Sequence, residues 1–133
     1  MQLSGSVDIA RPTGEVFAFV AEPENNPRWQ LGMRECRWTT EPPRGVGSRY
    51  EQVASLLGRR IEWTFEVTSL DTGRSITIET RESTFPIRVT RSVHPLGDAR
   101  CRVEASIEGG PGGLLRLFAP LMGFIAQRSI SRD

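Results

Sequence analysis

The clearest pattern in the chain is strict alternation between apolar and polar positions over residues 60–67. Ile61, Trp63 and Phe65 share one parity, while charged and hydroxyl side chains occupy the other. Such alternation predicts a β-strand with one buried and one solvent-facing side. Six more segments show alternation or a short apolar run between turn-forming residues: 3–9, 36–39, 48–57, 76–81, 87–94 and 101–108. The pattern therefore predicts an antiparallel sheet of about seven strands.

Helical spacing appears at two places outside the strands. After the first strand, Pro12 suits the first turn of a helix, and Val16, Phe17 and Val20 recur on one face. A second short helical segment ends at Trp29. These residues predict two short helices between the first and second strands.

A longer helix is expected over residues 113–133, where Leu117 and Leu121 belong to a broad apolar stripe. A curved sheet with one wet face must cover its other face, and this segment is the longest candidate. The expected class is α+β, with a ligand cavity between the sheet and the terminal helix. A cone that places its helices first and ends on strands is the alternative fold, and the terminal helix argues against it.

The amino-acid composition and net charge argue against several classes of function. The 133 residues fit one domain, 1–133, and the 17 basic and 16 acidic residues give a net charge of +1. This balance argues against nucleic acid as a partner. The chain has no lysine, which excludes Schiff-base chemistry and a phosphate-loop lysine. One histidine, His94, and two cysteines, Cys36 and Cys101, are too few for a zinc site, so we expect neither metal nor cofactor.

The termini carry no targeting signal that we can identify. The first residues lack a basic start followed by an apolar run, and no segment reaches the roughly 20 apolar residues of a membrane span. We expect a cytoplasmic protein with reduced thiols and no integral membrane association.

Several short motifs also point to a known family. They are the stretches at 9–17, 22–29, 45–50, 95–98 and 112–115, which read IARPTGEVF, EPENNPRW, GVGSRY, PLGD and GGLL. In order and spacing they resemble the START/Bet v 1-like helix-grip superfamily (SRPBCC), and more narrowly its polyketide cyclase/dehydrase-like branch. The resemblance covers nearly the whole chain. It departs at the end, because the family's final helix usually runs further than Asp133, so we expect either a longer natural chain or a less completely covered cavity.

The resemblance implies a curved antiparallel sheet gripping a long C-terminal helix. It also implies binding of an apolar or amphipathic small molecule, such as a lipid or polyketide, in the cavity between them. Two alternatives stay open: an aromatase/cyclase or dehydratase-type enzyme, and a protein-interaction module of the same fold. A homodimer is possible.

Arg91 is the most distinctive candidate for the binding site. Its parity places a charge among Ile87, Val89 and Val93, on the face expected to look inward. Its guanidinium could anchor a ligand carboxylate, phosphate or enolate. Alternatively, it extends to solvent or forms an internal salt bridge with Glu82 or Glu104.

The other expected site residues are mostly apolar or aromatic. Tyr50 would add a hydroxyl to the cavity wall, and Gln52 and Thr80 could orient a ligand. His94 has outward parity, which argues against a role as general base. The remaining expected lining residues are Trp29 near the cavity mouth and Trp63, Phe65, Ile78 and Leu121 on its walls.

Overall fold

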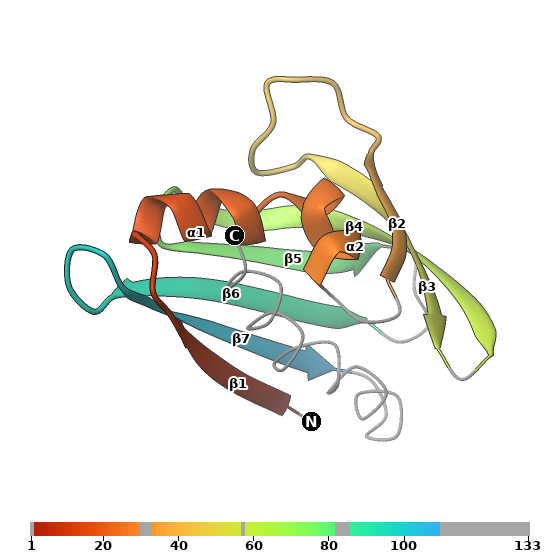
Figure 1. Cartoon of the computed structure of the whole chain (residues 1–133). Coiled ribbons are helices and arrows are strands. Elements are labelled where there is room, and N and C mark those ends of the chain that lie inside the picture. Colours follow the sequence, from red (N-terminus) through yellow and green to blue (C-terminus); the bar gives the residue numbers. More distant parts are fainter. Residues whose placement is uncertain (1, 30–32, 57, 82–85, 110–133) are drawn as a thin grey trace.

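The computed structural model describes residues 2–29, 33–56, 58–81 and 86–109, and its centre is a seven-stranded antiparallel sheet. The strand order is β1-β7-β6-β5-β4-β3-β2, so every neighbouring pair except β1 and β7 is consecutive in sequence (Figure 1). The strands are β1 (Gln2–Ile9), β2 (Met33–Trp38), β3 (Arg49–Leu56), β4 (Arg59–Asp71), β5 (Ser75–Arg81), β6 (Ile87–Pro95) and β7 (Cys101–Gly109). The predicted number of strands and their antiparallel arrangement are confirmed.

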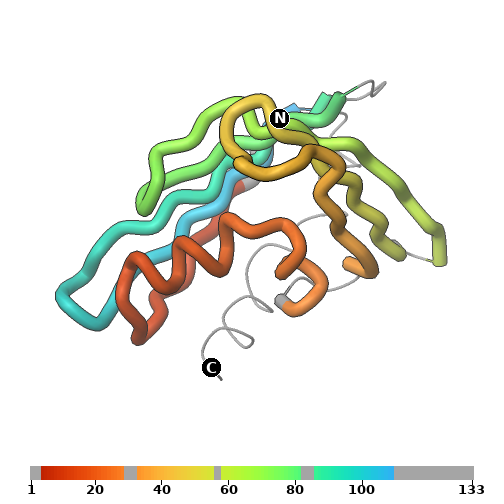
Figure 2. Tube along the Cα trace, turned by 90° about the horizontal axis from the view of Figure 1, so that it is seen from above, coloured from red at the N-terminus to blue at the C-terminus, as the bar shows by residue number. Residues whose placement is uncertain are grey.

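Three short helical elements connect β1 to β2 and lie against one face of the sheet. They are α1 (Thr13–Val20), the 3-10 turn η1 (Pro23–Asn25) and α2 (Asn26–Trp29). Helix α1 buries Val16, Phe17 and Val20, the residues whose spacing predicted it. The sheet curls around these helices (Figure 2). We call the side of the sheet toward the helices the inner face and the opposite side the outer face.

Strand β4 continues beyond residue 67, where the predicted strand ended. A β-bulge after Val67 reverses which side chains face inward, so the simple alternation stops there. Val67 pairs with Ile78 and Ser69 pairs with Thr77, which leaves Thr68 as an extra residue. A bulge of one residue turns the following side chains to the opposite face. Leu70 therefore packs against the inner core, where unbroken alternation would have put it outside.

The inner face carries a row of side chains that crosses four strands. Trp38 pairs with Tyr50, Tyr50 with Phe65, and Phe65 with Thr80. The Trp38 and Tyr50 rings meet edge to face, with centroids 5.7 Å apart, and Tyr50 stacks on Phe65 at 5.5 Å. Aromatic contacts of this kind add to the stabilisation from burial and fix the strand register.

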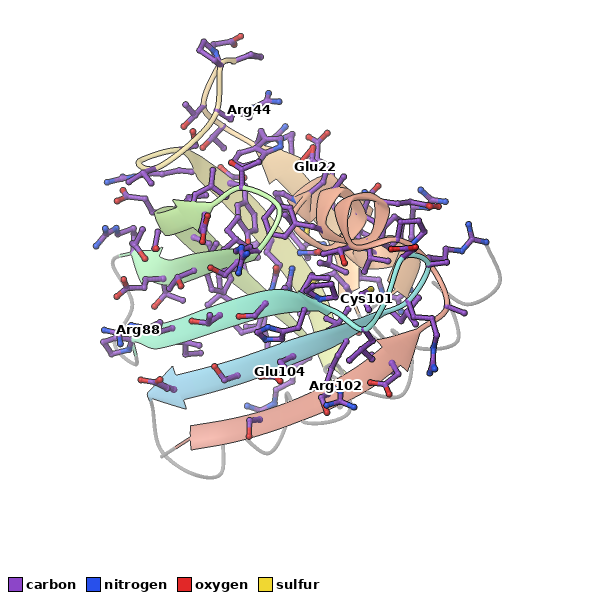
Figure 3. All side chains as sticks on the ribbon, turned by 90° about the vertical axis from the view of Figure 1, so that its left-hand side faces the viewer. Glu22, Arg44, Arg88, Cys101, Arg102 and Glu104 are labelled. Atoms are coloured by element: carbon purple, nitrogen blue, oxygen red, sulfur yellow. The ribbon has the colours of Figure 1, made fainter. Side chains whose placement is uncertain are left out.

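Cross-strand ion pairs cover the outer face. Glu66 accepts from Arg49 at 2.8 Å and from Arg81 at 2.6 Å, and Arg102 binds Asp8 at 2.7 Å. Arg88, Arg102 and Glu104 mark this charged side in Figure 3. The alternation in the sequence thus separates an apolar inner face from an ionic outer one.

The predicted C-terminal helix over 113–133 lies outside the described residues. The last described position, Gly109, ends β7 with φ of 112°. The helices of the described part of the chain are all too short or too polar to cross a membrane.

Candidate functional site

The inner face contains a small cavity beneath α1 and η1. Its volume is about 10 Å³, which is room for one water molecule at most. We call it the Arg91 cavity. Its lining residues are Ala21, Pro23, Trp38, Tyr50, Val67, Ile76, Ile78, Val89 and Arg91.

Arg91 is half-buried and links strand β6 to the helices. Its Nη1 donates to the carbonyl oxygen of Val20 at 3.0 Å and to Oδ1 of Asn26 at 3.3 Å. Val20 is the last residue of α1, so the guanidinium also compensates the negative end of that helix. Burial lowers the pKa of Arg91, but a guanidinium remains charged at neutral pH. The cavity wall therefore includes a fixed positive charge.

The predicted alternatives for Arg91 can now be compared with these contacts. Glu104 is exposed on the outer face, with its carboxylate 3.7 Å from Nε2 of His94. A salt bridge between Arg91 and Glu104 is therefore wrong, because adjacent β6 and β7 project the two side chains to opposite faces. Glu82 lies outside the described residues.

Asn26, Cys36 and Gln52 are also buried, although none of them lines the cavity. The Cys36 thiol lies 3.7 Å from Oε1 of Gln52, to which it can donate. Asn26 is fully buried, and its Nδ2 makes no hydrogen bond within the described part of the chain. Burial raises the pKa of Cys36 to about 11, so the thiol stays protonated and unreactive at neutral pH.

Tyr50 is the largest fully buried side chain and lies between Trp38 and Phe65. Burial raises the pKa of its hydroxyl, because the low-dielectric surroundings disfavour the phenolate. Tyr50 can therefore donate a hydrogen bond at neutral pH, but it cannot act as a base.

The structure brings three of the nine predicted site residues to the cavity wall: Tyr50, Ile78 and Arg91. Phe65 lies behind Tyr50, and Trp63 is half-buried beside Phe65 at a centroid distance of 6.4 Å. These two side chains support the wall and do not line this cavity.

Gln52 and Thr80 have the inward orientation that their parity predicted, since both are buried. The Thr80 hydroxyl accepts a hydrogen bond from the backbone N–H of Ile87 at 2.9 Å. Thr80 thus joins β5 to the start of β6. The side chain of Trp29 and all of Leu121 lie outside the described residues.

Trp38 is a wall residue that the sequence reasoning did not include. The signal was available, because Trp38 has the same parity as Cys36, which is buried on β2. Its indole N–H donates to both carboxylate oxygens of Glu22, at 3.0 and 2.9 Å. Asn26 was also missed, since a polar residue in a short helical turn gives no pattern.

His94 is exposed, as its parity predicted. Within the described ranges, no group of three or more His, Cys, Asp or Glu side chains could hold a metal ion. The cavity wall thus combines a positive charge, a neutral hydroxyl and apolar side chains.

Comparison with known proteins identifies the family. The family described as "Polyketide cyclase / dehydrase and lipid transport" matches residues 1–133. The chain belongs to this family, and the predicted resemblance is confirmed. No curated protein sequence matches the chain.

Solved structures share the fold at low sequence identity. A START superfamily protein from Mycobacterium smegmatis matches with a TM-score of 0.74 and 16% identity, over 86% of this chain and 83% of that one. Major latex-like protein 151 from Panax ginseng matches with a TM-score of 0.72 and 18% identity, over 91% of each chain. The di-domain ARO/CYC StfQ from the steffimycin biosynthetic pathway matches with a TM-score of 0.76 and 17% identity, over 98% of this chain and 45% of that one. These similarities show a shared fold, and the curled antiparallel sheet is consistent with the helix-grip type.

Proposed function

We propose that the protein binds an amphipathic small molecule with an anionic group on the inner face of the sheet. The apolar body of the ligand contacts Ile78 and Val89, and its anion meets Arg91. The family description, which includes lipid transport, agrees with a ligand of this kind.

One observation carries this proposal: a guanidinium lines an otherwise apolar cavity. Burying a charge is unfavourable unless it is well compensated, so an apolar residue at position 91 would be the simpler solution for packing alone. Arg91 donates to the Val20 carbonyl and to Oδ1 of Asn26. An anionic group of a ligand would add ion pairing to these hydrogen bonds.

The titration behaviour of the site favours binding over acid–base catalysis. Burial raises the pKa of both Tyr50 and Cys36, so neither group is ready to accept a proton at neutral pH. A cation and a neutral hydroxyl can hold an anion without transferring a proton.

An aromatase/cyclase activity is the second candidate. The specific observation in its favour is the similarity of the fold to two di-domain ARO/CYC proteins, BexL and StfQ, of which this chain covers 39% and 45%. In such a reaction Arg91 and Tyr50 would stabilise an enolate of a bound polyketide. Turnover of a model polyketide by the purified protein would support this candidate over a carrier.

The proposal is tested with two probes of the same shape and different charge, naphthoate and its neutral amide. Titration calorimetry should show that Arg91→Leu weakens naphthoate binding by about 1.5–3 kcal/mol, the range for a hydrogen bond to a charged group. Binding of the amide should change little.

Arg88→Leu is the matched control, because Arg88 is on the same strand and faces outward in ion pairs with Glu79 and Glu108. This variant should bind both probes as the wild type does. Equal losses for both probes in Arg91→Leu would mean that Arg91 only maintains the fold. If the leucine variant does not fold, Arg91→Gln provides the same comparison.

A further inference from the structure

A second hollow lies outside the Arg91 cavity, on the surface beside α1. Its volume is about 240 Å³, and its walls include Phe17, Ala21, Leu70 and Ile76. We call it the α1 groove. The side chains at its edge include Glu22 and Arg44, which lie at the same end of the molecule in Figure 3.

The α1 groove and the Arg91 cavity share part of their walls. Ala21, Trp38, Val67 and Ile76 line both spaces. Tyr50 lines the cavity and contacts one side of the Trp38 ring, at a centroid distance of 5.7 Å. Arg44 lines the groove, with its guanidinium 4.9 Å from the Trp38 ring centre. The indole is the largest of the four side chains that line both spaces.

Polar contacts hold the indole in this position. Its N–H donates to Glu22, and Arg44 lies over the ring. Arg44 is exposed and Glu22 and Trp38 are half-buried, so water can replace these contacts when the ring moves. Val67 and Ile76 are buried, whereas the Trp38 side chain is half-buried at the end of β2. Of these three shared wall residues, Trp38 is thus the one whose side chain is best able to move.

A wall must move if the proposed ligand is to enter. The cavity of about 10 Å³ cannot hold even a small aromatic acid, whereas the adjoining groove has ample volume. Arg44 lines the groove together with Glu22, and Arg91 lines the cavity. An anionic aromatic molecule would therefore meet a guanidinium in each of the two spaces.

We propose that the α1 groove is the entrance to the Arg91 cavity and that the Trp38 indole, held by Glu22 and Arg44, is the gate between them. This inference rests on the proposed binding function. The ligand class is an apolar or aromatic molecule with one anionic group. Its apolar part occupies the groove before the indole moves aside.

Stopped-flow fluorescence with anilinonaphthalene sulfonate, an anionic aromatic probe, tests the gate. Glu22→Gln weakens the closed position of the indole. Because the cavity is too small for the probe while the indole is in place, the indole stays displaced in the complex. The association rate should therefore rise and Kd should fall by a similar factor, while the dissociation rate changes little. We expect about a three- to tenfold rise, the effect of weakening one charge-assisted hydrogen bond.

Two further variants make the test specific. Trp38→Phe keeps an apolar ring but removes the N–H, so it should raise the association rate as Glu22→Gln does. The double variant should show no further increase, because both single changes remove the same contact. Glu24→Gln is the control, since Glu24 accepts from the backbone N–H of Trp38 at 3.2 Å and does not hold the ring.

The outcomes separate the two proposals. Unchanged rates in Glu22→Gln and Trp38→Phe, with binding intact, would show that Trp38 is not the gate and leave the binding function standing. Failure of the wild type and both variants to bind the probe would overturn the binding function, and the gate with it. Binding that appears only in the variants would support the gate.

Discussion

Arg91 has a structural role as well as the proposed ligand contact. One of its nitrogens joins β6 to the C-terminal end of α1 and to Asn26 of α2. These partners are 71 and 65 positions away in the sequence. The parity of β6 predicted the inward direction of Arg91, but no local pattern could reveal contacts over that separation.

Asn26 offers a way to change the environment of Arg91 without removing it. Asn26→Asp puts a carboxylate where Oδ1 now accepts from the guanidinium. We expect naphthoate binding to weaken by about tenfold or more, because the new carboxylate competes for the positive charge. Calorimetry should show little change for the neutral amide. Undiminished naphthoate binding would indicate that the ligand does not use Arg91.

The strands were the easiest elements to predict, because alternation identifies a half-buried strand directly. The bulge at Thr68 in β4 was missed. A bulge depends on pairing with β5, and the sequence of β4 alone does not specify its partner or register. The short helices were predicted from the spacing of Val16, Phe17 and Val20, which are all buried in α1.

Gly109, the last residue of β7, has a backbone conformation and a close neighbour that favour glycine. Its φ of 112° is unfavourable for side chains, and a Cβ there would collide with the carbonyl oxygen of Pro86. Gly109→Ala should lower the free energy of unfolding by about 1–3 kcal/mol. Gly5→Ala in β1 is the control, since a Cβ there meets no atom within 4 Å. Chemical denaturation measures both, and equal stability of the two variants would contradict the expectation.

The Glu66 ion-pair network should make the sheet sensitive to acid. Arg81 and Arg49 lower the pKa of Glu66 below its ordinary value of 4.5, mainly through hydrogen bonds. A lowered native pKa stabilises the fold above the unfolded-state pKa, and this stabilisation is lost as pH falls through the native value. Glu66→Gln should therefore be less stable than the wild type at neutral pH.

The stability difference for Glu66→Gln should shrink as the pH falls below 4.5. Thermal unfolding at several pH values measures this. Glu62→Gln on the same strand is the control, because Glu62 contacts Arg60 in an exposed pair and should contribute little. A difference for Glu66→Gln that persists at low pH would show that the charge of Glu66 is not its source.

For the molecule as a whole, the sequence predicted the order of strands and short helices and the apolar inner face. It did not predict the size of the cavity. That size depends on how Trp38, Tyr50 and Phe65 pack across three strands, and such packing is a property of the assembled sheet. The sequence also did not predict that Trp38 would line both the Arg91 cavity and the adjoining α1 groove.

The inner-face site is tested most directly by nuclear Overhauser contacts between naphthoate and methyl-labelled protein. The account predicts contacts from the naphthalene ring to the methyl groups of Ile78 and Val89, which line the cavity. Their sequence neighbours Thr77 and Thr90 point to the outer face, where their hydroxyls lie 3.1 Å apart. Contacts to the threonine methyls alone, or to no methyl group at saturating naphthoate, would contradict a binding site on the inner face.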